Sequence, residues 1–78
     1  MKELIEYIAR SLVDDPTQVQ VQQRRRGSEI KIRLQVAKED MGRVIGKGGR
    51  IANAMRTLLN VTAARTGKRA SLDVEDPR

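Results

Sequence analysis

The chain has 78 residues, with 16 lysines and arginines against 10 aspartates and glutamates, which leaves a formal net charge of +6. This length predicts one small domain with little room for a catalytic cleft, and such an excess of positive charge is common among proteins that bind polyanions. The absence of cysteine and histidine excludes disulfides, thiolate chemistry, the usual zinc sites and imidazole catalysis. No signal peptide and no apolar run of membrane-spanning length is recognisable, so we expect a cytoplasmic protein without membrane contact.

The first half of the chain predicts one helix and a pair of strands. Apolar side chains recur at helical spacing over residues 2–13, and Asp14-Asp15-Pro16 ends this helix because the residue before proline avoids the α region. Residues 18–23 and 29–36 alternate apolar with polar side chains, which predicts two strands with one buried face each. The segment Arg24-Arg25-Arg26-Gly27-Ser28 is predicted as the turn of an antiparallel hairpin, with three arginines at its tip.

The second half predicts two helices and a strand. Residues 38–45 are expected to form a short helix, residues 50–66 a long one, and residues 69–75 a third strand, whereas residues 75–78 are expected to fray. The predicted inner stripe of the long helix comprises Ile51, Ala52, Met55, Leu58, Leu59 and Thr62. Asn53, Arg56 and Asn60 are predicted to face outward, and Ala54 and Val61 to widen the apolar arc on one flank.

This order of elements predicts an α+β fold. Each strand has one apolar face, so a three-stranded mixed sheet should bury that face under three helices. The hairpin makes the first two strands antiparallel. The second and third strands are connected through two helices and can therefore lie parallel.

The two helices of the second half are joined by Gly46-Lys47-Gly48-Gly49. Glycine allows backbone N–H groups to approach a bulky partner closely, and the N-terminus of the following helix offers unsatisfied donors and partial positive charge. Lys47 and Arg50 add full charges at the same place. This segment is therefore predicted to hold phosphate.

Two familiar phosphate-binding loops do not fit. A Walker A loop needs four residues between its first glycine and the Gly-Lys pair, but only three separate Gly42 from Gly46, and Gly48 stands where a hydroxyl is needed. In the dinucleotide fingerprint, Ile51 occupies the place of the last glycine. What remains is G-x-x-G between two helices, which the KH module uses to clamp the backbone of four nucleotides.

The element order, with G-x-x-G between two helices, resembles the KH domain in its prokaryotic, type II arrangement over essentially the whole chain. Residues 42–50, Gly-Arg-Val-Ile-Gly-Lys-Gly-Gly-Arg, look closely like that family's signature. In size the chain is similar to the small stand-alone bacterial KH proteins. The resemblance implies a single KH domain over residues 1–78, single-stranded RNA as ligand, an RNA-chaperone or post-transcriptional role in the cytoplasm, and a homodimer or a heterodimer with a larger KH-type partner. It implies no cofactor and no catalysis.

The resemblance also implies RNA-binding residues. The glycine loop, Gly46, Lys47, Gly48 and Gly49, would hold the sugar-phosphate backbone. Arg43, Lys47 and Arg50 would neutralise about three phosphates, which predicts a slope near −2 for log K against log salt. Val44 and Ile45, with apolar residues of the second strand, would line a groove for unpaired bases, although plain core is an equal reading for Val44. Arg24, Arg25 and Arg26 at the hairpin tip would face the glycine loop across that groove.

Two other function classes stay open. The chain could be a protein-interaction or assembly module, associated with the ribosome or with a KH-type partner, that docks through the flank at Ala54 and Val61. The glycine loop would then be only a structural connection. An enzyme comes third, because no paired acid–base constellation lies beside a nucleophile.

Overall fold

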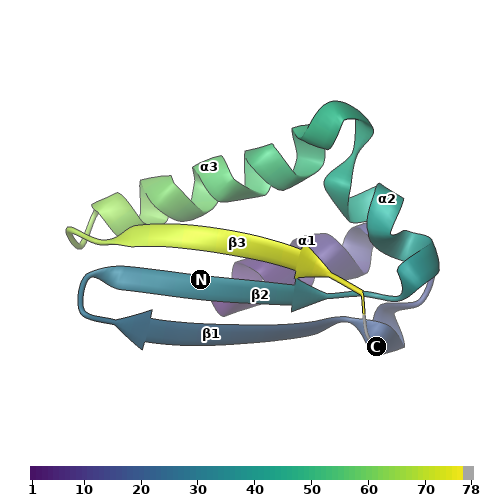
Figure 1. The fold of residues 1–78 in the computed structure, drawn as a ribbon, viewed down its shortest axis with the longest axis horizontal. Coiled ribbons are helices and arrows are strands. Elements are labelled where there is room, and N and C mark those ends of the chain that lie inside the picture. Colours follow the sequence, from purple (N-terminus) through teal and green to yellow (C-terminus); the bar gives the residue numbers. More distant parts are fainter. Residues whose placement is uncertain (77–78) are drawn as a thin grey trace.

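The computed structural model describes residues 1–76 as six regular elements in the expected order (Figure 1). These are α1 (Lys2–Leu12), β1 (Gln20–Arg26), β2 (Glu29–Gln35), α2 (Met41–Ile45), α3 (Arg50–Ala64) and β3 (Arg69–Glu75). Short 3₁₀ turns precede β1, α2 and α3, at Pro16–Gln18, Lys38–Asp40 and Lys47–Gly49. The predicted α+β architecture is confirmed. Among residues 1–76 we find no helix that combines the length and the apolar character needed to cross a bilayer.

The sheet has the strand order β1-β2-β3, with β2 in the centre. It is mixed, because β2 is antiparallel to β1 and parallel to β3. The helices cover one face of the sheet: in Figure 1, α3 runs along β3 and α1 lies behind the strands. The other face is uncovered, and the side chains that alternate onto it are polar. We call it the open face.

The core lies between the sheet and the three helices. The strands contribute Val21, Ile30, Ile32, Leu34 and Leu72, and the helices contribute Ile5, Ala9, Val44, Ala52, Met55, Leu59 and Ala63. The buried positions of α3 recur at three- and four-residue intervals, which places them on one stripe. This stripe is narrower than predicted, since Leu58 and Thr62 are exposed. Only the side chains of α3 that point toward the sheet are buried, and Leu58 and Thr62 point away from it.

The hairpin is tighter than the sequence suggested. Its turn contains only Gly27 and Ser28, because Gly27 adopts a positive φ of 60° that a two-residue turn requires. The three arginines therefore do not form the turn but are the last residues of β1, which begins at Gln20 after the 3₁₀ turn rather than at residue 18. Consequently they alternate across the sheet, with Arg24 and Arg26 on the open face and Arg25 on the side of the helices.

The ends of α3 and β3 also differ from prediction. The long helix ends at Ala64 instead of residue 66, and the chain reverses at Gly67, whose φ is 69°. Glu75 does not fray, since it pairs with Gln35 in the β2–β3 ladder and its carbonyl accepts the N–H of Val36 at 3.2 Å. Residues 77–78 of the predicted frayed end lie outside the described residues.

Candidate nucleic-acid interface

The glycine loop projects from the end of the molecule where α2 meets α3 (Figure 1). The N–H of Gly46 closes α2 on the carbonyl of Gly42 at 2.9 Å, and the N–H of Gly49 closes the loop on the carbonyl of Gly46 at 3.1 Å. Within residues 1–76, the backbone N–H groups of Lys47 and Gly48 have no backbone partner. They lie just before the N-terminus of α3, so two free donors and the positive end of a helix dipole coincide.

Each glycine of the loop adopts a positive φ, but for different reasons. Gly46 has φ 77° and ψ 169°, and a Cβ there would lie 2.7 Å from Cγ1 of Ile51, so a side chain is excluded by space as well as by backbone conformation. Gly48 has φ 64° and ψ 18°, and a Cβ there would meet nothing within 4 Å. Gly49 has φ 80°, with only the side chain of Asn53 nearby at 3.7 Å. Gly46 thus shapes the loop, whereas Gly48 leaves its outer surface open.

The charges at the loop are fewer than predicted. Lys47 and Arg50 are exposed, and neither pairs with a carboxylate in the described part of the chain. Arg43, however, is engaged: its Nη2 lies 2.9 Å from Oδ2 of Asp14, and its Nε lies 3.4 Å from Oδ1 of Asp40. Two cations, not three, are therefore available to an incoming phosphate without breaking an ion pair.

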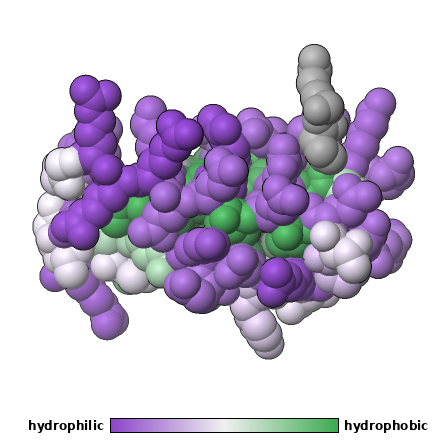
Figure 2. Space-filling view, turned by 90° about the horizontal axis from the view of Figure 1, so that it is seen from below, coloured by the Kyte–Doolittle hydropathy of each residue, from purple (hydrophilic) through white to green (hydrophobic). Residues whose placement is uncertain are grey.

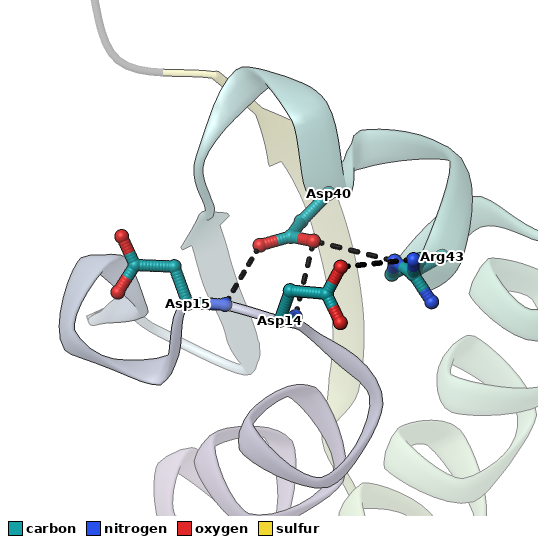
Figure 3. A network of polar contacts seen from close by, with 4 residues as sticks. All are labelled: Asp14, Asp15, Asp40 and Arg43. Carbon is teal, nitrogen blue, oxygen red and sulfur yellow. Dashed lines mark hydrogen bonds and ion pairs between the residues drawn. The ribbon is translucent and has the colours of Figure 1, made fainter.

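Asp40 is the centre of this network (Figure 3). Asp40 is only 2% exposed, and its carboxylate accepts hydrogen bonds from the backbone N–H groups of Asp14 and Asp15 at 3.1 Å each, in addition to the contact with Arg43. A buried carboxylate is tolerable only with such partners. Asp40 thereby ties the connection between α1 and β1 to the start of α2, the helix that carries the glycine loop. No local pattern signals this role, because Lys38-Glu39-Asp40 looks like the charged, solvated first turn of the helix predicted for residues 38–45.

Most of the apolar side chains predicted to line a groove for bases belong to the core instead, which for Val44 confirms the alternative reading as core. Val44 is fully buried in the core, and the apolar residues of β2 are buried because β2 is the central strand, with neighbours on both sides and helices above. Ile45 remains half-buried beside the loop, and Ile51 is half-buried against Gly46. Within residues 1–76, Ile45 and Ile51 are the aliphatic side chains beside the glycine loop that stay partly accessible.

The polar residues of α3 reach the edge of β3. Nε and Nη2 of Arg56 donate to the carbonyl of Leu72 at 3.3 and 3.1 Å, and Nη1 donates to Oδ1 of Asn53 at 2.9 Å. The N–H of Ala70 donates to Oδ1 of Asn60 at 3.0 Å. All three side chains face outward as predicted, but Arg56 and Asn60 also satisfy backbone groups along the outer edge of the sheet. Arg56 is therefore a structural cation.

The hairpin arginines do not face the glycine loop. The turn at Gly27 and Ser28 lies beside the start of β3, where the N–H of Arg69 donates to the carbonyl of Ser28 at 2.9 Å. The glycine loop lies at the other end of α3, whose 15 residues span about 22 Å (Figure 1). The reason is topological: β2 runs from the hairpin turn toward α2, so the turn and the helix that carries the loop occupy opposite ends of the sheet.

This fold and its loop define a KH domain of the α-β-β-α-α-β arrangement, with G-x-x-G between its second and third helices. A family model described as "KhpA/KhpB, KH domain" matches residues 2–74, and the chain belongs to this family. The chain is 49% identical to the RNA-binding protein KhpA of Clostridium acetobutylicum, over 95% of this chain and 99% of the relative. It is 51% identical to that of Treponema pallidum, over 96% and 94%, and 43% identical to that of Halalkalibacterium halodurans, over 97% and 100%. The expected resemblance to small stand-alone bacterial KH proteins is confirmed.

Proposed function

We propose that this protein binds single-stranded RNA without catalysing a reaction, and that the loop Gly46–Gly49 holds the sugar-phosphate backbone. The observation that carries the proposal is the exposed loop at the start of α3, where two backbone donors and two cations, Lys47 and Arg50, have no partner among residues 1–76. The relatives named RNA-binding protein support the same ligand. We extend the proposal to a cytoplasmic RNA chaperone or post-transcriptional regulator, in keeping with an RNA ligand.

The proposed grip is electrostatic and depends on backbone approach. A phosphate over the loop accepts hydrogen bonds from the N–H groups of Lys47 and Gly48. The absence of a Cβ at Gly48 lets the RNA strand come close. Lys47 and Arg50 neutralise the flanking phosphates, while Ile45 and Ile51 offer aliphatic contact to a base. A base can reach these side chains only when it is unpaired.

Unpaired RNA is expected to bind more tightly than an RNA hairpin stem of the same length. For a strand just long enough to cover the loop, the two cations without an ion pair in the described residues give a slope of about −1.4 for log K against log salt. This is less steep than the slope of about −2 that three cations would give, because Arg43 is held by Asp14 and Asp40. Fluorescence anisotropy at several salt concentrations measures both quantities. Equal affinity for stem and unpaired strand would contradict the proposal.

We further propose that the protein pairs through α3, either with a second copy or with a larger KH-type protein. Leu58 is 47% and Val61 56% exposed, and both lie on the side of α3 turned away from the core. Contiguous apolar surface of this kind marks interaction sites. The family name also joins KhpA to a second protein, KhpB, which is in keeping with a heterodimer.

Val61→Asp is expected to shift the protein from dimer to monomer in sedimentation analysis without changing the circular dichroism, because it places a charge in an apolar contact. Ser11→Asp is the matched control, since it adds the same charge to an exposed position of α1. A wild-type protein that is already monomeric at high concentration would contradict self-association. If the Val61→Asp variant dimerised as tightly as the wild type, this flank of α3 would be excluded as the dimer interface.

A further inference from the structure

We infer that the open face of the sheet carries a second RNA-backbone site, at the hairpin end of the molecule and separate from the glycine loop. The inference rests on the proposed function for the nature of its ligand. It would make binding bipartite: the loop holds one short segment of the strand, and the open face holds a segment further along the same strand.

The ladder pairing divides the open face into four rows of three side chains. The row nearest the turn holds Arg26, Glu29 and Arg69, and the next row holds Arg24, Lys31 and Ser71. The third row holds Gln22, Arg33 and Asp73, and the last holds Gln20, Gln35 and Glu75. The two rows near the turn therefore carry four cations and one carboxylate, whereas the two far rows carry one cation and two carboxylates. Positive charge is concentrated at the hairpin end.

The second row is electrostatically unfavourable by itself. Arg24 and Lys31 are direct partners across the antiparallel ladder, and like charges directly opposite each other destabilise a sheet. Neither forms an ion pair within residues 1–76, in contrast to Arg33, which lies 3.3 Å from Glu75. Two adjacent cations that have no counterion in the described part of the chain form a site for an anion from outside it.

The surface around this pair is hollowed. A hollow of ≈ 530 Å³ is lined by Arg24, Arg26, Glu29 and Lys31 of the open face, together with Arg25 from the side of the helices. A second hollow of ≈ 180 Å³ is lined by Gln22, Arg24, Lys31, Ile32, Arg33 and Asp73, so Arg24 and Lys31 border both. Figure 2 shows hydrophilic side chains along the whole length of this side of the molecule, the hairpin end included. An extended chain of phosphates fits such a run of hollows better than a single small anion does.

The chemistry of the face favours a nucleic-acid backbone. The four rows present no aromatic side chain on which a base could stack and no apolar side chain to line a base pocket, so contacts would go to phosphates and carry no sequence information. The glycine loop and the hairpin end of the molecule lie at opposite ends of α3, whose 15 residues span about 22 Å, so the few nucleotides held by the loop cannot also reach the hairpin end. Strand length should therefore decide whether both sites are used.

The test compares two unpaired RNAs built only from A and C, one of about four nucleotides and one about five times longer. For the wild-type protein, the long strand is expected to give a steeper salt slope than the short one, by at least about 1.4, which corresponds to two more neutralised phosphates. The salt slope, not the affinity, is the deciding measurement. A long strand offers more positions at which the protein can bind, which raises the apparent affinity, but each bound protein then still contacts the same number of phosphates.

The variant Arg24→Gln/Lys31→Gln is expected to abolish this difference for the long strand and to leave the short strand unchanged. Removing the like-charge pair should not lower the melting temperature, so lost binding cannot be ascribed to unfolding. Lys2→Gln/Arg10→Gln, on α1, removes equal charge from the covered side of the sheet and should retain the steep slope.

The outcomes separate the two proposals. If the short strand does not bind the wild-type protein, the glycine-loop function fails. If the short strand binds but both strands give the same slope, the second site is overturned and the open face is left as a surface for an acidic protein segment. If the α1 variant flattens the slope as much as the open-face variant does, only net charge matters and the site is again overturned.

Discussion

Replacing Lys47 and Gly48 together by aspartate is expected to weaken the binding of unpaired RNA at least about tenfold, or about 1.4 kcal/mol. The change removes one positive charge and adds two negative ones where the loop meets phosphate. At a protein surface, like charges about 4 Å apart repel by roughly 1–4 kcal/mol, and salt screens part of this. Titration of fluorescent RNA with the wild type and the variant measures the loss.

The fold should survive this double substitution. Gly48 lies in the left-handed region at φ 64° and ψ 18°, which aspartate and asparagine adopt more readily than other residues with a side chain, and a Cβ there meets nothing within 4 Å. Aspartate is also favourable near the N-terminus of α3. We therefore expect a melting temperature within a few degrees of wild type.

Lys47→Asn/Gly48→Asn is the matched control, because asparagine has the size and backbone preference of aspartate without its charge. It should lose less affinity than the aspartate pair. Unchanged RNA affinity in the folded aspartate variant would falsify the assignment of the glycine loop. Equal losses in both variants would mean that side-chain bulk, not charge, opposes the strand.

Gly46→Ala is expected to destabilise the protein by at least about 2 kcal/mol, which lowers the melting temperature of a domain of this size by about 10 °C. At φ 77° and ψ 169° the backbone lies in a region open almost only to glycine, and the new Cβ would lie 2.7 Å from Cγ1 and 3.0 Å from the backbone N of Ile51. Thermal unfolding followed by circular dichroism measures the change.

Gly42→Ala is the companion to this experiment. Gly42 lies four residues earlier in α2, has no positive φ and leaves open space around a Cβ. Alanine there should stabilise the protein by about 0.5–1 kcal/mol, because it lowers the entropy of the unfolded chain and favours the helix. If both alanine variants changed stability in the same direction, the crowding at Gly46 would not be what shapes the loop.

Local patterns in the sequence determined the elements and their order. The alternation in residues 29–36 and 69–75, the helical spacing in residues 2–13, and the glycines between two helices all report short-range geometry, which depends on neighbours a few positions away. The α+β fold follows because each strand has one apolar face that must be covered. The glycine loop was recognisable for the same reason, since its special backbone is encoded within four residues.

Tertiary structure decided which side chains share a surface. The family resemblance implied that Arg24–Arg26 face the glycine loop, but the direction of β2 puts them at the far end of the sheet. It made Arg43 a free cation, but Asp14, 29 residues away in the chain, comes within 2.9 Å of it through the turn that Asp40 holds. The sequence pattern also included Leu58 and Thr62 in the buried stripe of α3, but both are exposed in the structure. The ion-pair partner and the burial of a side chain depend on residues distant in the chain, so they cannot be predicted from a local sequence pattern.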